Sequence, residues 1–331
     1  MEFQQIFNTA TVTTFAIWFV VFWYYHGTGI TLGYHRLLTH KSLKLPKLLT
    51  YAICSGGYFC LMGGPINWVG THRLHHQKSD MDGDPHSPVH GFKHALYEWM
   101  FTMGDKQSDE EIERQVPDLL QDKFLVSLGV HHEPKQAQRC LILSILFRVL
   151  ILVTLGWIPL LANLAATFMV FWSPQLVNSV CHMKNHGYRL FETRDESRNV
   201  WWVGIMACGE GWHNNHHAVP RSAQHGMAWW EFDVTWLTIL FLEKIGLAKD
   251  VVKPQSLEIE QKRLQRAYDI VQARKSTAPV SKTAIKLAAS KASAKEVDDF
   301  DYADDYADMA RVETKVEAEV EQPELVGASN K

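Results

Sequence analysis

Residues 11–32 form an apolar run that contains no Asp, Glu, Lys or Arg. A helix needs ~20 predominantly apolar residues to cross the hydrocarbon core of a bilayer, so this run predicts a membrane span. A longer apolar stretch, residues 140–181, is interrupted near its middle by Gly156. Its length and this turn residue predict two further spans, 141–158 and 160–181, joined as a hairpin. The chain is therefore predicted to be an all-α, polytopic membrane protein with about three spans.

A further apolar stretch, residues 48–69, is rich in glycine and contains Pro65. If it crossed the membrane, the histidines before and after it would lie on opposite faces, ~30 Å apart. We therefore predict a helix that is buried in, or lies on, a membrane-facing cap. Lys and Arg are absent from residues 1–10 but follow the first run closely, at Arg36, Lys41, Lys44 and Lys47. The positive-inside rule then predicts a cytoplasmic cap and an N-terminus on the outside.

The apolar and aromatic residues lie almost entirely before residue 254, although the chain of 331 residues is 47% hydrophobic overall. Lys, Ala, Glu and Ser dominate the remainder, which has too little apolar content to fold alone. This change predicts a membrane domain, residues 1–253, and a polar, largely disordered tail, residues 254–331. The net charge of −3 gives no electrostatic basis for binding nucleic acid.

Two groups among the 17 histidines of the chain share one spacing. HRLHH contains His72, His75 and His76, and HNNHH contains His213, His216 and His217. Positions i, i+3 and i+4 share one face of an α-helix, so each triplet can converge on one metal ion or straddle two. Imidazole suits iron, zinc, copper and nickel. Because a repeated triplet is hard to explain by chance, we predict a shared metal site.

A third motif, HRLLTH, places His35 and His40 five residues apart. They are separated by ~140° around an α-helix of ~3.6 residues per turn. Both reach one site only if the helix frays or if they serve different metals. His182 stands alone just after the hairpin. The other histidines are interpreted as a hydrogen-bonded interior residue (His26), a surface pair (His131 and His132), and loop or supporting residues (His86, His90, His94, His186 and His225).

The three motifs, in this order and at these separations, resemble the histidine boxes of membrane fatty acyl desaturases. The first box, H-x4-H, is that of the delta-9, stearoyl-type branch. The similarity includes GITLGYHR, DGDPHSP, VNSVCH and WWEFDVTW, covers about residues 10–250 and is greatest to bacterial and cyanobacterial forms. It implies a di-iron centre in the cap, with a water held on one iron by Asn178. The implied iron ligands are His35, His40, His72, His75, His76, His182, His213, His216 and His217.

The same resemblance implies an enzyme that uses O2 to introduce a cis double bond, at the delta-9 position, into a saturated acyl chain. O2 accepts four electrons, of which the acyl chain supplies two. The chain has no flavin or nicotinamide fingerprint, no ferredoxin cysteine spacing and no HPGG haem motif. We therefore expect no bound haem or flavin, and a separate electron donor of the ferredoxin or cytochrome b5 type.

The acyl carrier is less well defined by the resemblance. Acyl-CoA desaturases of animals and fungi have an Arg-Asp pair before the second box, where this chain has Gly70 and Thr71. This difference favours an acyl-lipid over an acyl-CoA substrate and leaves both open. Trp68, near the second box, is the best candidate for the wall of an acyl tunnel. Arg148, inside a predicted span, is expected to extend toward the interface. Glu210 receives no defined role.

Two alternative functions remain. A fatty acyl or alkane hydroxylase could use the same histidine scaffold, although the box spacing argues against it. A histidine-rich metal transporter, from a different class, would place its ligands within the spans along the ion pathway. The histidine boxes of this chain follow the spans instead.

Overall fold

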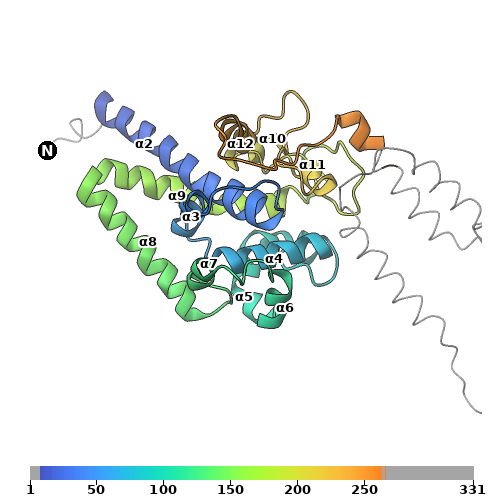
Figure 1. Cartoon of the computed structure of the whole chain (residues 1–331), viewed down its shortest axis with the longest axis horizontal. Helices are drawn as coiled ribbons and strands as arrows, with labels where there is room; N and C mark the ends of the chain where they lie inside the picture. Colours follow the sequence, from blue (N-terminus) through green and yellow to red (C-terminus); the bar gives the residue numbers. More distant parts are fainter. Residues whose placement is uncertain (1–7, 263–264, 266–331) are drawn as a thin grey trace, which may run out of the picture. The chain divides into compact units, whose positions relative to one another are not determined.

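The computed structural model describes residues 8–262 and residue 265 (Figure 1). Within them the backbone forms helices and isolated bridges but no β-strand, which confirms the all-α prediction. The chain divides into two units, residues 1–268 and 269–331. Most of the predicted polar tail lies outside the described residues, so its predicted boundary at residue 254 stays a prediction. The helices are α2 (Thr9–Thr28), η1 (Gly29–Thr39), α3 (Lys47–Phe59), α4 (Pro65–Lys78), η2 (Pro88–His90), η3 (His94–Glu98), α5 (Trp99–Lys106), α6 (Asp109–Gln115), α7 (Lys123–Leu128), α8 (Pro134–Leu155), α9 (Trp157–Val180), α10 (Trp201–Met206), α11 (His213–Ala218) and α12 (Val234–Lys244).

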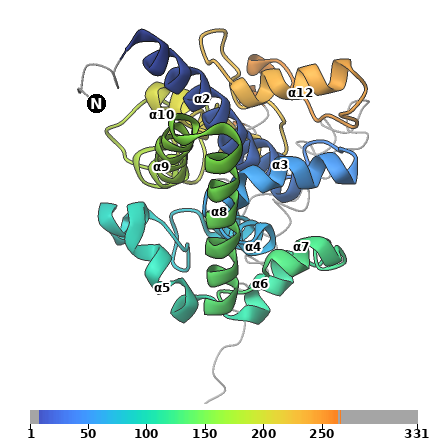
Figure 2. The same cartoon turned by 90° about the vertical axis from the view of Figure 1, so that its left-hand side faces the viewer.

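Three helical segments in the described part of the chain are long and apolar enough to cross a membrane. They are Thr9–Thr39, which joins α2 and η1, Pro134–Leu155 (α8) and Trp157–Val180 (α9). Gly156, with a φ of 95°, forms the turn between α8 and α9, and α2 packs against α9 (Figure 1, Figure 2). The prediction of a membrane protein with three spans is confirmed. The helices extend beyond the predicted spans, since the first continues to Thr39 and α8 begins at Pro134, and the bounds of the spans themselves stay a prediction.

Residues 48–69 belong to two helices, α3 and α4, and not to the single helix that the sequence predicted. The helical structure is interrupted between them, where Leu61 and Gly63 adopt φ values of 66° and 77°. Pro65 then occupies the first turn of α4, where its missing N–H costs no helical hydrogen bond. The stretch is not among the candidate spans within residues 8–262, in agreement with its predicted place in the cap.

The first span changes from an α-helix to a π-helix at Gly29 and keeps this form through Thr39. In a π-helix each N–H bonds to the carbonyl five residues earlier. The N–H of His40 accordingly donates to His35 O at 3.1 Å. The expectation that His35 and His40 reach one site only if the helix frays, or else serve different metals, was wrong. The wider helix places both rings on one side, with centroids 4.7 Å apart.

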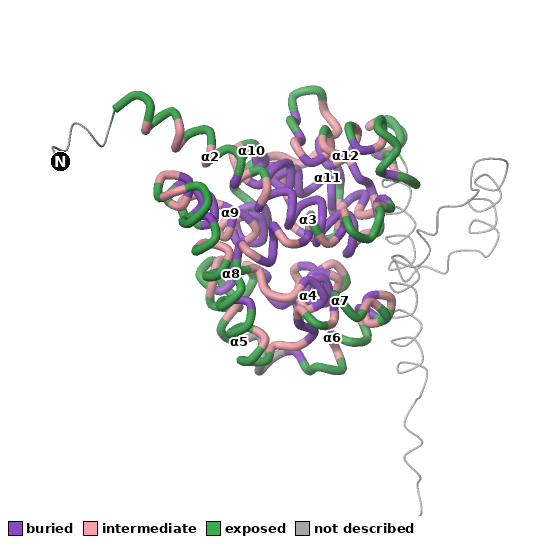
Figure 3. The backbone as a smooth tube through the Cα atoms, turned by 60° about the vertical axis from the view of Figure 1, so that its left-hand side comes forward, coloured by how far each residue is buried: buried purple, intermediate pink, exposed green. Residues whose placement is uncertain are grey.

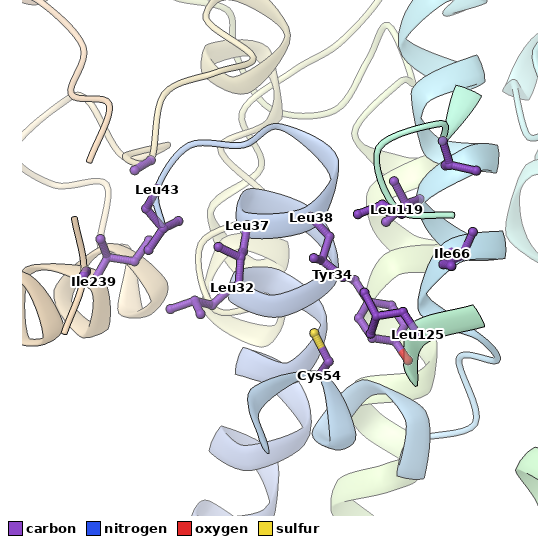
Figure 4. Close-up of a cluster of buried hydrophobic side chains, with 14 of the residues drawn as sticks. Leu32, Tyr34, Leu37, Leu38, Leu43, Cys54, Ile66, Leu119, Leu125 and Ile239 are labelled. Atoms are coloured by element: carbon purple, nitrogen blue, oxygen red, sulfur yellow. The ribbon is translucent and has the colours of Figure 1, made fainter. Parts of the chain in front are cut away.

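A hydrophobic core joins η1, α3, α4 and α12 and holds the π-helix in the cap (Figure 4). Glycine allows the backbones of the first span and α3 to approach closely. A Cβ added to Gly29 would lie 2.2 Å from Gly57 N. Buried residues are concentrated around α4 and α11, whereas α8 and the first half of α2 are largely exposed, as expected of lipid-facing surfaces (Figure 3).

A polar cluster lies buried between the spans. His26 is fully buried; its Nδ1 lies 2.8 Å from Gly56 O and its Nε2 lies 2.9 Å from Asn163 Nδ2. His26 is thus a hydrogen-bonded interior residue, as predicted. Arg148 donates to Thr167 Oγ1 at 3.0 Å and to main-chain carbonyls. It therefore binds within the protein, and the expectation that it extends to the interface was wrong.

Candidate metal centre

The nine histidines predicted as ligands lie together in two groups. Within each group the candidate ligand nitrogens all lie within 4.8 Å of one another. The five-histidine group consists of His35, His40, His72, His76 and His216, and the four-histidine group consists of His75, His182, His213 and His217. His40, His76 and His217 are partly exposed, and the other six are buried.

Each histidine triplet contributes to both groups. α4 gives His72 and His76 to the five-histidine group and His75 to the other. α11 divides in the same way, with His216 in the five-histidine group and its remaining two histidines in the other. The rings of His76 and His217 have centroids 4.6 Å apart, so the two groups adjoin. Of the two arrangements that the triplet spacing allowed, the structure has the straddling one.

The distances between ring nitrogens fit a metal site. Neighbouring Nε2 atoms lie 3.0–3.1 Å apart in the pairs His40–His35, His35–His216, His216–His76, His76–His72 and His182–His213. Two nitrogens bound at ~2.1 Å to one ion and at right angles to each other lie ~3.0 Å apart, whereas a tetrahedral angle gives ~3.4 Å. A neutral imidazole carries one N–H, so hydrogen bonds alone cannot satisfy the row from His40 to His72, in which the three middle Nε2 atoms each meet two others. The arrangement suits ions with near right-angled coordination.

Three histidines of the four-histidine group hold a carboxylate at Nδ1. The pairs are His75–Asp84 at 2.9 Å, His182–Asp80 at 2.8 Å and His217–Asp195 at 2.6 Å. A carboxylate in this position keeps the proton on Nδ1, leaves the Nε2 lone pair for a metal and increases its basicity. The Nε2 atoms of His75 and His217 are buried and have no hydrogen-bond partner among the described residues, as expected of ligand atoms.

Glu210 lies behind the five-histidine group. Its Oε2 lies 2.6 Å from His35 Nδ1 and 3.1 Å from His225 Nδ1. Its Oε1 accepts from the guanidinium of Arg36 at 3.0 and 3.2 Å. Arg36 is fully buried and also pairs with Asp233 at 3.0 Å. Glu210, which had no defined role from the sequence, thus links a candidate ligand to a buried cation.

The protonation states of the cap residues favour metal binding. Burial lowers the pKa of His40, His72, His76, His213 and His216 well below the usual value, and lowers that of His217 to about 4. Burial also opposes ionisation of Asp84 and Asp195, but the adjacent imidazoles outweigh it and lower both pKa values. Burial lowers the pKa of His182 too, yet its bond to Asp80 raises it overall. A metal at this site would therefore bind mostly neutral imidazoles.

The remaining histidines of the cap have different surroundings. The His86 ring lies against His75 with centroids 4.3 Å apart, and the His225 ring lies against His216 at 4.4 Å. Both are buried and lie directly behind candidate ligands. The other histidines lie farther from the candidate ligands. His94 is buried, with its Nε2 3.2 Å from Pro85 O, and His90 and His186 are exposed. His131 lies beside Glu113 and His132 beside Asn67, and both are partly buried.

A cavity of about 240 Å³ adjoins both groups, and His35, His72 and His213 form part of its wall. Trp68 also lines it and stacks on His72 with ring centroids 4.9 Å apart. Asn178 lines it from α9. Many of the other lining residues are apolar, among them Ile30, Leu61, Met62, Phe171 and Val177. An apolar cavity that ends at clustered imidazoles can hold a hydrocarbon chain beside a metal centre.

Three carboxylates of this site, Asp80, Asp84 and Asp195, were not identified from the sequence. Asp80 and Asp84 lie in SDMDGDP, directly after HRLHH. An acidic segment so close to a histidine box was an available signal, because metal-binding histidines commonly pair with carboxylates. Asp195 lies in the loop between α9 and α10 and gave no comparable signal.

Comparisons with known proteins agree with this geometry. The fatty acid desaturase family model matches residues 12–239. A sn-2 palmitoyl-lipid 9-desaturase of Nostoc sp. (strain 36) is 42% identical over 233 residues, which cover 70% of this chain and 78% of that protein. A sn-1 stearoyl-lipid 9-desaturase of Anabaena variabilis is 39% identical over 235 residues, covering 70% and 81%. The chloroplastic palmitoyl-monogalactosyldiacylglycerol delta-7 desaturase of Arabidopsis thaliana is 40% identical over 235 residues, covering 70% and 60%.

The matched region includes both histidine groups and the three candidate spans for most of their length. The hydroxylase and transporter alternatives are not favoured, since the relatives are named desaturases. The chain belongs to the fatty acid desaturase family and is a membrane enzyme that uses O2 to introduce a double bond into a fatty acyl chain.

Proposed function

We propose that the nine clustered histidines bind two iron ions, five at one position and four at the other, and that Asn178 holds a water on one of them. The observation that carries this proposal is the convergence of nine imidazoles into two adjoining groups. Their nitrogen spacing and the carboxylates at Nδ1 support it. Imidazole is a ligand that suits iron, and family membership supports a metal centre.

Bound iron would supply the O2-dependent oxidation of an unactivated methylene, which side chains alone cannot perform. O2 takes up four electrons and four protons to give two waters. The acyl chain provides two electrons and two protons, an external donor provides the other two electrons, and the solvent provides the other two protons. The protein binds the acyl chain in the apolar cavity, and Trp68 fixes its path beside His72. The apolar residues that line the cavity would keep water away from the reacting carbons.

The substrate is an acyl chain of a membrane lipid, and the new bond is at the delta-9 position. The names of the Nostoc and Anabaena relatives support both assignments. An Arabidopsis relative of similar identity is named a delta-7 desaturase, so the position of the double bond has to be measured. Acyl-CoA is the alternative carrier. The electron donor is a separate protein of the ferredoxin or cytochrome b5 type.

The cap faces the cytoplasm and the N-terminus lies outside. The side chains of Lys41, Lys44 and Lys47, at the cap end of the first span, are 59%, 78% and 80% exposed, which supports this orientation. Modification of a cysteine introduced at Lys44 by a membrane-impermeant reagent tests it. We expect labelling only after the membrane is made permeable. Labelling in intact cells would show that the cap lies outside.

Expression in a host that lacks the double bond tests the reaction. Fatty acids are then analysed separately in each lipid class and in the acyl-CoA pool, with His216→Ala as the inactive control. We expect cis-9 monounsaturated chains to appear first in membrane lipids. An alcohol product would contradict desaturation, and earlier appearance in acyl-CoA would contradict the lipid substrate.

A further inference from the structure

The two histidine groups differ in the number of carboxylates that contact the Nδ1 atoms of their rings. In the part of the chain that the structure describes, three Nδ1 atoms of the four-histidine group bond to carboxylates, whereas the five-histidine group contacts one, Glu210. The nine candidate ligands themselves are all imidazoles. Any difference in charge between the two metal positions must therefore come from these residues behind the ligands.

No cationic side chain among the described residues neutralises the three aspartates beside the four-histidine group. Asp80 accepts from Ser87 Oγ and Glu196 N, besides the His182 ring. Asp84 and Asp195 accept in the same way from main-chain N–H groups. Their ion-pair contacts among the described residues are to histidines alone, with no Lys or Arg. Neutral donors hold each carboxylate in place without cancelling its charge.

Glu210 is arranged differently. The buried Arg36 guanidinium bonds to its Oε1, while its Oε2 is shared between His35 and His225. The guanidinium is shared between Glu210 and Asp233, so these three groups together keep one net negative charge beside the five-histidine group. Glu210 contacts one candidate ligand of that group, His35, whereas the aspartates contact three of the four ligands of the other group.

We propose that Asp80, Asp84 and Asp195 are positioning residues that strengthen metal retention at the four-histidine position, whereas Glu210 acts through one ligand, His35, at the five-histidine position. The inference rests on the proposed assignment of nine ligands to two ions. Removal of a carboxylate from behind a ligand typically lowers metal affinity ~10–100-fold. Such a loss is expected at one of the two ions.

The test uses the full-length protein, purified in detergent and loaded with iron. Release to an excess of iron chelator is followed over time, and iron per chain is measured before and after. The variants are Asp84→Asn, Asp195→Asn and Glu210→Gln, in which an amide oxygen can still accept from Nδ1–H. The matched control is Asp122→Asn, since Asp122 bonds to Tyr51 and caps α7 away from the histidines. Mössbauer spectra of the loaded variants report the two ions separately.

We expect each aspartate variant to release one iron ~10–100-fold faster than the wild type and the other at the wild-type rate. One Mössbauer component should change. Glu210→Gln should loosen the other ion and leave the aspartate-supported ion at the wild-type rate, and Asp122→Asn should release both ions as the wild type does. Equal loosening of both ions or unchanged release in the aspartate variants would overturn the inference, as would loosening of the same ion by Glu210→Gln. Fewer than two irons in the wild type would instead overturn the ligand assignment and the inference with it.

Discussion

Two buried clusters of this protein contain histidine, and they differ in how the ring nitrogens are satisfied. Between the spans, His26 Nδ1–H donates to Gly56 O, and its Nε2 accepts from Asn163. One neutral tautomer satisfies the whole ring. In the candidate metal centre the Nε2 atoms face one another, and no single set of tautomers satisfies them all. Burial of histidine therefore does not indicate a ligand, whereas convergence of unsatisfied nitrogens does.

The largest effect is expected from substitution of histidines in the candidate metal centre. His75→Ala and His216→Ala each remove a candidate ligand, one from each group. We expect loss of unsaturated product and of bound iron, with normal insertion into the membrane. His90→Ala is the matched control, because His90 is exposed. Product analysis, iron content and membrane fractionation make the test, and retained activity in either ligand variant would contradict the assignment.

Acidification should affect the iron-free centre strongly. Burial lowers the pKa of both His217 and His225 to about 4 in the folded protein. Above the unfolded value of ~6.5 neither state binds the proton, so stability is constant. Below it the unfolded chain takes up protons that the folded chain does not, and stability falls until pH approaches 4. Unfolding midpoints of the iron-free protein from pH 7.5 to 4.5 test this, and a flat profile would contradict the buried, neutral state of these rings.

Substitution of His26 is expected to affect stability without affecting the metal. His26→Leu leaves the buried Asn163 amide without its partner and removes one of the two donors to Gly56 O, which costs ~1–3 kcal/mol. The midpoint of thermal unfolding in detergent should fall, while iron per chain stays as in the wild type. Loss of iron without loss of stability would show that the two clusters are not separate.

The smallest effect is expected at the cavity wall. Trp68→Phe retains a ring against His72 but widens the cavity. Preference between chain lengths should shift by up to ~10-fold toward longer chains, since one methylene in an apolar pocket is worth ~1–3 kcal/mol. Product profiles from mixed substrates measure the shift. Trp229→Phe, at a 93% exposed position, should leave the profile unchanged; an equal shift there would argue against Trp68 as the tunnel wall.

The spans and the convergence of the two histidine triplets could be predicted from the sequence, because apolar length and helical spacing are local properties. His35, His40 and His182 were included among the ligands only through the resemblance to the desaturases. The π-helix was missed, since its form depends on how η1 packs against α3 and α4, and spacing alone suggested that His35 and His40 diverge. Asp195 was missed for a similar reason. It meets His217 only because a loop folds back over α11, and no short motif records that contact.

Iron content of the purified wild-type protein, measured together with its Mössbauer spectrum, tests the metal centre most directly. Nine imidazoles in two adjoining groups predict two irons per chain, with ligand parameters typical of nitrogen donors. Loss of both irons on denaturation, and slow exchange before it, are also expected. One iron or none in active protein, or a spectrum dominated by oxygen ligands, would contradict the proposed site.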